Sequence, residues 1–391
     1  MNDALVDLSP ASLLDEARAR TGLDDFGEDG FRARLATLCA MYDGAAGLSP
    51  RGRKATRHRL VQLLANRLHI QRTFATHPEI RARPLRRPLY LTGLPRTGTS
   101  ALFNLLAADP AARPLRYWEG VFPAPPAEAM EPGATDPRIA VVEDSLARAA
   151  ARNPEMARIH AVSALGPEEC VQLLAHSLGG VQNGIEPMIA PYREHFFTQD
   201  LAPIYAYYVD LLRLVDWQRP GERWLLKSPA HLWALDHLTA QLPDACIVWT
   251  HRDPLAIIGS YCSMVQALMS IRERVEPTEL GPLVLEYLAR SVERGLEARA
   301  RLDERRFVDV DYARFVRDPL GTAERIYGAF DLPLTPAVLA ALEAHRTANP
   351  QNKHGSHVYT LEQFGLTAGA VTARMARYLE RFGLTTTTRT V

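Results

Sequence analysis

The chain has 391 residues, enough for one large α/β domain with a helical extension or for two domains. Hydrophobic residues make up 47% and charged residues 23%, as in an ordinary globular protein. The 45 basic and 45 acidic residues give a formal net charge of +0, so no global field favours nucleic acid or an anionic membrane surface. Any anion must therefore be bound by a local cluster of positive groups.

The spacing of the cysteines and the lengths of the apolar runs predict the cellular compartment of the protein. The four cysteines form no C-x-x-C pair, which favours a reducing environment. The segment from Met1 to Ala11 is acidic and lacks the apolar core of a secretion signal. No apolar run approaches the roughly 18 to 20 residues that span a bilayer. We therefore expect a cytoplasmic protein without an integral membrane segment.

The first 85 residues are predicted to form a helical region that packs on the main domain. Apolar residues recur at helical spacing from Ser49 to Ala75, and this pattern ends near Pro78. We find no glycines here that would cradle a ligand, so packing is the predicted role of this region.

From residue 86 onward, short apolar runs alternate with helical patterns. The predicted strands are 89–92, 224–226, 246–249 and 307–310. The predicted helices are 100–108, 139–151, 167–178, 200–215, 230–241, 254–269, 279–303 and 318–330. Residues 109–138, rich in Pro, Ala and Gly, are expected to form a long surface segment. This alternation predicts a three-layer α/β domain with a central parallel sheet over 86–383, followed by a frayed tail at 384–391.

A glycine-containing loop joins the first predicted strand to a helix. Its residues are Gly93-Leu94-Pro95-Arg96-Thr97-Gly98-Thr99-Ser100. Such a loop aims several N–H groups, and the helix dipole, at one anion. Gly98 permits close approach of the backbone, Thr97, Thr99 and Ser100 add hydroxyls, and Arg96 adds a charged, forked donor. Thr99 replaces the lysine of the G-x-x-x-x-G-K-[ST] motif, which disfavours a nucleoside triphosphate and favours a single 5′-phosphate.

A second candidate anion site follows the third predicted strand, where the sequence reads His-Arg-Asp-Pro. Arg252 stands at the carboxyl end of that strand, the edge where open α/β sheets bind ligands, and a helix is expected to begin at Pro254. Ser260 follows eight residues later, about two helical turns into that helix. Arg252 and Ser260 together could hold a second phosphate. The alternative is a structural ion pair of Arg252 with Asp253 or Asp309.

Together the two motifs resemble the sulfotransferases, most closely the bacterial family that uses 3′-phosphoadenosine 5′-phosphosulfate (PAPS). The resemblance covers roughly residues 86–365. It implies the three-layer, P-loop-like sulfotransferase fold, with the 5′-phosphosulfate on the loop and the 3′-phosphate on Arg252 and Ser260. The implied loop residues are Pro95, Arg96, Thr97, Gly98, Thr99 and Ser100.

The resemblance also suggests catalytic residues. Lys227 is one of three lysines in the chain and ends a predicted strand, where many sulfotransferases use a lysine to steer the departing phosphate. Many relatives place a histidine base two residues further on, but Pro229 stands there. The remaining candidates for the base are Glu168 and Glu169, at an expected helix start, and His231.

Further donor contacts are predicted from the same resemblance, and the acceptor pocket is predicted from the sequence itself. Lys353 and Gly355 are similar to the segment that folds over the 3′-phosphate, and Tyr312 to a tyrosine near adenine. The acceptor pocket is expected to be lined by residues 113–138 and 167–178, with Trp118 and Phe122 as candidate walls.

The function predicted from the sequence is transfer of a sulfuryl group from PAPS to a hydroxyl of a small molecule, such as an alcohol, phenol, lipid or glycan-like compound. The products would be a sulfate ester and 3′-phosphoadenosine 5′-phosphate (PAP), and no metal is required. Two alternatives remain open at this stage: a magnesium- and ATP-dependent small-molecule kinase, and a catalytically inactive nucleotide-binding protein.

Overall fold

The computed structural model describes residues 6–126, 134–152, 162–180, 182, 184–349 and 360–386. Within these ranges one sheet has the order β2-β3-β1-β4-β5, and every neighbouring pair is parallel. Its strands are β1 (Leu89–Gly93), β2 (Ala112–Pro114), β3 (Arg223–Lys227), β4 (Cys246–His251) and β5 (Phe307–Asp311). The predicted parallel sheet is confirmed, with β1 at its centre.

Helices precede, connect and follow the strands. Those before the sheet are α1 (Pro10–Thr21), α2 (Gly30–Asp43) and α3 (Pro50–Thr76). Those up to β4 are α4 (Thr99–Leu106), α5 (Tyr117–Val121), α6 (Pro137–Arg152), α8 (Val171–Leu174), α9 (Ala190–Thr198), α10 (Ala202–Gln218) and α11 (Leu235–Gln241). The remainder are α12 (Pro254–Leu268), α13 (Pro277–Arg299), α14 (Tyr312–Arg317), α15 (Pro319–Ala329), α16 (Pro336–Ala348), α17 (Ala368–Arg374) and α18 (Ala376–Phe382).

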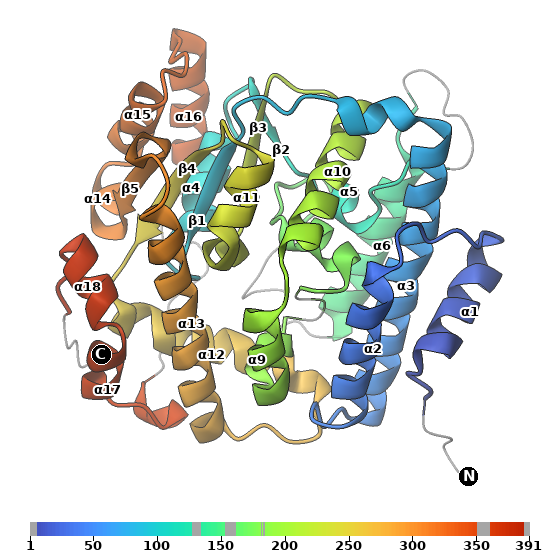
Figure 1. The fold of residues 1–391 in the computed structure, drawn as a ribbon. Helices are drawn as coiled ribbons and strands as arrows, with labels where there is room; N and C mark the ends of the chain where they lie inside the picture. The colour runs from blue at the N-terminus through green and yellow to red at the C-terminus, as the bar shows by residue number, and fades with distance from the viewer. Residues whose placement is uncertain are drawn as a thin grey trace.

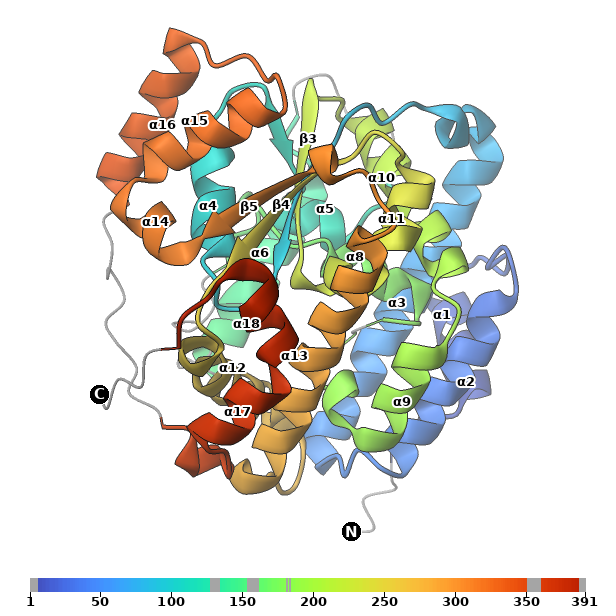
Figure 2. The ribbon, with the colours of Figure 1, turned by 60° about the vertical axis from the view of Figure 1, so that its left-hand side comes forward.

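The sheet is covered on both faces, because successive strand side chains point to opposite sides. Leu89 and Leu91 belong to the core beneath α4 and α15, whereas Tyr90 belongs to the larger core on the other side. Figures 1 and 2 show α4 and α14–α16 on one side of the strands and α10, α11 and α13 on the other. The predicted three-layer α/β architecture is confirmed.

The N-terminal helices share the larger core instead of forming a separate one. Leu13, Phe31 and Leu64 are buried in the same cluster as Trp249 of β4. Helix α3 begins at the cap Ser49, whose side chain accepts a hydrogen bond from the Gly52 N–H, and Pro50 takes the first helical position. In Figure 1 these helices stand at the edge opposite α14–α16.

The segment before α8 departs from the predicted helix 167–178. Helix α8 starts only at Val171, so Glu168 and Glu169 lie in the extended chain before it. Their backbone bonds go elsewhere: the Glu168 N–H donates to the Leu115 carbonyl (2.8 Å) and the Cys170 N–H donates to the Lys227 carbonyl (2.9 Å). Tertiary pairing thus replaces the first helical turn.

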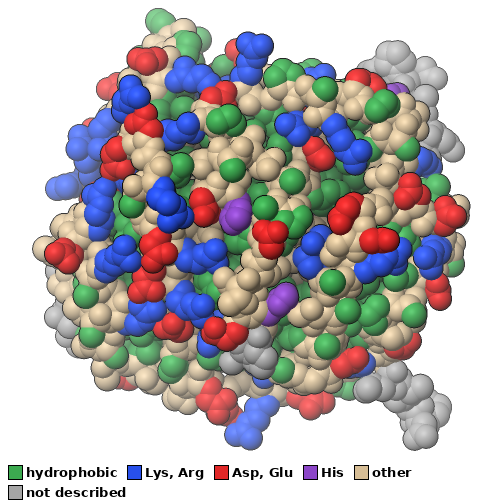
Figure 3. All heavy atoms as spheres, viewed as in Figure 1, with side chains coloured by type: hydrophobic (Ala, Val, Ile, Leu, Met, Phe, Trp, Pro, Cys, Tyr) green, Lys and Arg blue, Asp and Glu red, His purple; other side chains and the backbone are tan. Residues whose placement is uncertain are grey.

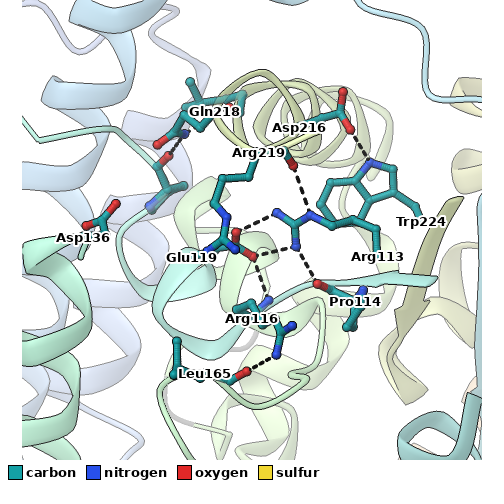
Figure 4. Close-up of polar contacts among 12 residues, drawn as sticks. Arg113, Pro114, Arg116, Glu119, Asp136, Leu165, Asp216, Gln218, Arg219 and Trp224 are labelled. Carbon is teal, nitrogen blue, oxygen red and sulfur yellow. Dashed lines mark hydrogen bonds and ion pairs between the residues drawn. The ribbon is translucent and has the colours of Figure 1, made fainter. Parts of the chain in front are cut away.

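Residues 109–138 also differ from the expected surface segment, because they contain β2, α5 and the start of α6. Arg113, in the middle of β2, pairs with the buried Glu119 of α5 (Nη2 to Oε1, 2.6 Å), and the Arg116 N–H donates to the same carboxylate (2.9 Å). This network, shown in Figure 4, fixes the corner against which the Glu168 segment is hydrogen-bonded.

The surface fits the balanced charge of the chain. Basic and acidic side chains are interspersed on the face in Figure 3, with no region of a single sign covering it. Across the part of the chain that the structure describes, no helix has both the length and the hydropathy needed to cross a bilayer.

Candidate active site

A cavity of about 530 Å³ opens at the carboxyl ends of the central strands. The sheet register explains its position: Leu91 is level with Lys227, and Gly93 is level with Thr250, so the segments after β1, β3 and β4 emerge at one edge. Most of its lining residues fall into two sets, and Glu168 and Glu169 lie among the others. The loop wall consists of Leu94, Pro95, Arg96, Gly98, Thr99, Ser100, Ala101, Arg252 and Tyr312. The helix wall consists of Arg59, Val171, Gln172, Gln182, Met188, Leu232, Trp233, Tyr261, Met264, Leu268 and Tyr287.

The loop after β1 requires glycine at two positions. Gly93 has φ +140° and a side chain there would meet the Thr250 carbonyl oxygen at 2.5 Å, while Gly98 has φ +85° and would meet Tyr312 Cδ2 at 2.8 Å. Arg96 is also left-handed, with φ +67°, which is uncommon for a residue with a side chain. The loop therefore folds tightly between β4 and Tyr312, with the first turn of α4 facing the cavity.

The three hydroxyl side chains of this loop do not all face the cavity. Thr97 is buried; its hydroxyl donates to the Leu94 carbonyl (2.6 Å) and lies 2.6 Å from the Thr250 hydroxyl. Thr97 therefore stabilises the loop on the side that faces β4 and does not line the cavity. Thr99 and Ser100 line the cavity, as expected for anion-binding groups.

Arg96, Ser260 and Arg252 are in direct contact. Arg96 Nε donates to Ser260 Oγ (3.0 Å), and Arg252 Nη1 donates to the Arg96 carbonyl (3.0 Å). Arg252 also lies 4.2 Å from the ring centroid of Tyr312. Arg96 and Arg252 both line the cavity, so the two predicted anion sites meet there. Ser260 is buried and is not among the lining residues.

The alternative ion pair of Arg252 with Asp309 is wrong. Asp309 accepts hydrogen bonds from Arg299 (2.7 and 2.8 Å) and lies 2.8 Å from His251 Nε2. No carboxylate among the described residues forms a salt bridge with Arg252. Its guanidinium instead contacts the Arg96 carbonyl and the Tyr312 ring.

Lys227 lies just behind the cavity wall and contacts two of its residues. The ammonium group donates to Ser100 Oγ (3.1 Å) and forms a salt bridge with Glu169. Its side chain is 4% exposed, against 20% for that of Glu169. The loop after β1, a strand-end lysine and a carboxylate thus converge on one point.

Glu168 lies beside this point and also lines the cavity. Burial, followed by the repulsion of the Glu169 carboxylate, raises the pKa of Glu168 to about 7. Its Oε1 accepts a hydrogen bond from the Glu169 N–H (2.8 Å). A carboxyl group with this pKa can take or release a proton near neutral pH.

Comparisons with known proteins identify the family of this chain. A family model described as the sulfotransferase family matches residues 88–336. The chain belongs to the sulfotransferase family. The solved sulfotransferase STF9 from Mycobacterium avium has a TM-score of 0.89 and 30% identity, covering 99% of this chain and 100% of that one. Sulfotransferase STF1 from Mycobacterium tuberculosis H37Rv has a TM-score of 0.83 and 34% identity, covering 94% and 98%.

One curated relative matches a shorter part of the chain. The omega-hydroxy-beta-dihydromenaquinone-9 sulfotransferase Stf3 of Mycobacterium bovis (strain ATCC BAA-935 / AF2122/97) is 26% identical over 164 residues, which are 41% of this chain. The alignment spans 40% of the length of that relative. The resemblance to bacterial sulfotransferases and the fold expected from it are both confirmed.

The structure does not bring His231 to the cavity of this sulfotransferase. Its side chain is fully buried, its Nδ1 lies 3.0 Å from the Tyr205 hydroxyl, and its ring packs edge-on against Tyr90. Burial lowers the pKa of His231 to about 3, so it is neutral and enclosed. The turn at Pro229–Ala234 that follows β3 directs it into the core.

The expected acceptor walls need correction. Trp118 is buried in a small cluster with Val142 and Ala164, and Phe122 packs against that cluster. No residue of 113–126 or 134–138 lines the cavity, whereas Glu168, Glu169, Val171 and Gln172 of the predicted segment 167–178 do. Lys353 and Gly355 lie outside the described residues.

Most residues of the helix wall could not be predicted from the sequence. Trp233, Tyr261 and Tyr287 come from three segments that are far apart along the chain, and no local motif marks them. Arg59 had one detectable signal: it stands four residues before Leu63 and so shares a face of α3 with an apolar core residue.

Proposed function

We propose that this sulfotransferase transfers a sulfuryl group from PAPS to a hydroxyl of a small molecule. The observation that carries the proposal is the contact between the two anion sites: the Arg96 carbonyl accepts from Arg252 and the Arg96 side chain donates to Ser260. One nucleotide can therefore reach the phosphate loop and Arg252 within a single cavity.

The loop wall binds the donor in this proposal. The N–H groups at the start of α4, with Thr99 and Ser100, hold the 5′-phosphate and sulfate oxygens. Arg252 and Ser260 hold the 3′-phosphate, and Arg96 links the two groups. Tyr312, which supports Arg252 and abuts Gly98, forms the side of the nucleotide pocket.

Transfer requires one bond to form and one to break. The acceptor oxygen attacks sulfur in line, the bond from sulfur to the bridging oxygen breaks, and its electron pair leaves with PAP. Lys227 stabilises the charge that develops on the bridging oxygen. The acceptor proton passes to a carboxylate, so the products are a sulfate ester, PAP and a proton.

We assign the proton acceptor to Glu169, with Glu168 as its neighbour in the same carboxylate pair. Glu169 holds Lys227 in the structure, and a donor that draws the ammonium toward its bridging oxygen would release this carboxylate next to the acceptor hydroxyl. The enclosed position of His231 argues against the histidine candidate.

The acceptor occupies the helix wall, whose surface is largely apolar. This favours a hydroxylated aromatic or lipid-like compound, and the Stf3 relative is named for an omega-hydroxylated menaquinone. Four buried, unbridged cysteines fit a reducing compartment, and we place the enzyme in the cytoplasm.

The test is transfer of radiolabelled sulfur from PAPS to a panel of hydroxylated compounds, combined with calorimetry of the nucleotides. We expect labelled product formed in equal amount with PAP, and binding of PAP without added metal. Magnesium-dependent binding of ATP with no affinity for PAP would indicate the kinase instead. Binding of PAP without transfer to any compound would indicate a nucleotide-binding protein.

A further inference from the structure

Arg59 places a positive charge in the otherwise largely apolar helix wall. It lies on α3, in the N-terminal region, and is one of the residues that line the cavity. Nη2 donates to Gln172 Oε1 (3.1 Å), which is its one hydrogen bond to the described residues. Burial lowers the pKa of Arg59, but an arginine remains charged at neutral pH.

Other inward-facing arginines of α3 are compensated by the protein. Arg53 forms a salt bridge with Asp43, and Arg57 pairs with Glu16 (2.5 Å). Arg67 also lacks a carboxylate partner among the described residues, and its buried Nη1 has no hydrogen bond there. Its guanidinium is held by the carbonyls of Phe26 and Glu28 (2.8 and 3.1 Å) and lies over the rings of Phe31 and Tyr207. Arg59 has no carboxylate partner in the described ranges.

An enclosed charge without a partner is costly, so its retention needs a compensating anion. The carboxylate of Glu186 is near enough to act on Arg59, but it accepts hydrogen bonds from Tyr42 and from the Gln182 and Ile185 N–H groups (3.2 and 3.1 Å). Arg59 itself lines the cavity, where a ligand could meet its remaining donors.

The position of Arg59 relative to the reacting groups follows from Gln172. The Gln172 N–H donates to the Glu169 carbonyl (3.3 Å), so these two residues stand one turn apart. Arg59 is thus held by the residue one turn, about 5 Å, beyond the proposed base. A molecule whose hydroxyl meets Glu169 would extend toward Arg59.

We propose that Arg59 binds an oxyanion of the acceptor, which is therefore an alcohol or phenol carrying a carboxylate or phosphate about one helical turn from the reacting hydroxyl. This inference rests on the proposed sulfuryl transfer. Arg59 would select acidic acceptors, because a forked guanidinium in an enclosed site binds an oxyanion in a defined orientation.

The test compares acids with their methyl esters, which keep the hydroxyl and the ring but lose the charge. Para-hydroxybenzoate and its ester serve for carboxylates, and para-hydroxyphenyl phosphate and its dimethyl ester for phosphates. Binding is measured by calorimetry on the PAP-loaded protein, and KM by transfer of labelled sulfur. In the wild type we expect one acid to bind roughly 10- to 100-fold more tightly than its ester.

Three variants separate recognition from structure. Arg59→Met should remove the preference by weakening the acid and leaving the ester within about twofold, whereas Arg59→Lys should restore part of it. Arg51→Met, an exposed arginine in the first turn of α3, is the matched control.

Three results would overturn the inference. The first is equal affinity of acids and esters in the wild type, and the second is an equal loss of affinity for both in Arg59→Met. The third is a loss of affinity for PAPS but not for PAP in Arg59→Met, which would place the sulfuryl group on Arg59. Failure of PAP to bind, by contrast, would reject the proposed function.

Discussion

The two walls of the cavity are assembled in different ways. The loop wall is built almost entirely from the residues that directly follow β1 and β4, so its charged groups are positioned by the sheet register. The helix wall collects side chains from α3, α8, α12 and α13, from the segment between α8 and α9, and from the turn after β3. These elements meet only through tertiary packing. A donor common to a whole family can be bound by local motifs, whereas an acceptor particular to one enzyme depends on long-range packing.

The largest effect on catalysis should come from substituting Lys227, which lies between the two walls. Lys227→Met removes the charge that stabilises the departing oxygen and should lower kcat by about 10³-fold, measured in single turnovers. PAP affinity should change little, because the phosphate loop is intact. Lys54→Met, an exposed lysine in α3, is the control and should retain full activity. Equal losses in both variants would contradict a chemical role.

Glu169→Gln should lower kcat by about 10²-fold, since the amide cannot accept the acceptor proton. The amide oxygen can still accept a hydrogen bond from Lys227, so we expect the affinity for PAP, measured by calorimetry, to persist. Glu222→Gln, at an exposed glutamate before β3, is the matched substitution. Retained kcat in Glu169→Gln would move the base to Glu168 or elsewhere.

Arg252→Met should affect the loop wall alone. Loss of a charged, forked donor should weaken PAP binding by roughly 10- to 100-fold and leave the affinity for AMP, which lacks the 3′-phosphate, unchanged. Calorimetry with both nucleotides measures the difference, and Arg314→Met, exposed on α14, is the control. A parallel loss of AMP affinity would show that Arg252 supports the loop and does not read the 3′-phosphate.

The smallest effect on catalysis is expected from Glu168, which is better tested by stability. Its pKa of about 7 lies above the ordinary value of 4.5, so the folded chain holds a proton that the unfolded chain releases between these pH values. The free energy of unfolding should therefore fall as pH rises from 4.5 to 7.

Glu168→Gln should remove this contribution, which we estimate at about 1 to 3 kcal/mol. Urea unfolding of the wild type and the variant from pH 4.5 to 7 measures this contribution. At pH 7 the variant should be the more stable of the two proteins. An unchanged pH dependence in the variant would show that Glu168 is not the titrating group.

The sequence was informative where short-range chemistry determines structure. Gly93 and Gly98 lie in backbone conformations that disfavour side chains, and Arg252 follows a buried strand, so both motifs could be identified without tertiary information. Four of the five strands and the three layers followed from the apolar runs for the same reason, whereas β2 (Ala112–Pro114) was not predicted.

The failures share one physical cause, which is that tertiary contacts decide where a side chain points. His231 and Thr97 have suitable chemistry and spacing, yet packing directs one into the core and the other behind the loop. Trp118 fills a local cluster, and the Glu168 segment pairs with Leu115 where a helix was expected. Arg59 gains its importance only from elements more than a hundred residues away in sequence, such as Gln172.

A crystal structure of the chain with PAP bound would test the central claim most directly. The account predicts the 5′-phosphate against the first turn of α4, at Gly98 to Ser100, and the 3′-phosphate within hydrogen-bonding distance of Arg252 and Ser260. A nucleotide bound in the reverse orientation, or bound so that only one of its phosphates meets these residues, would contradict it.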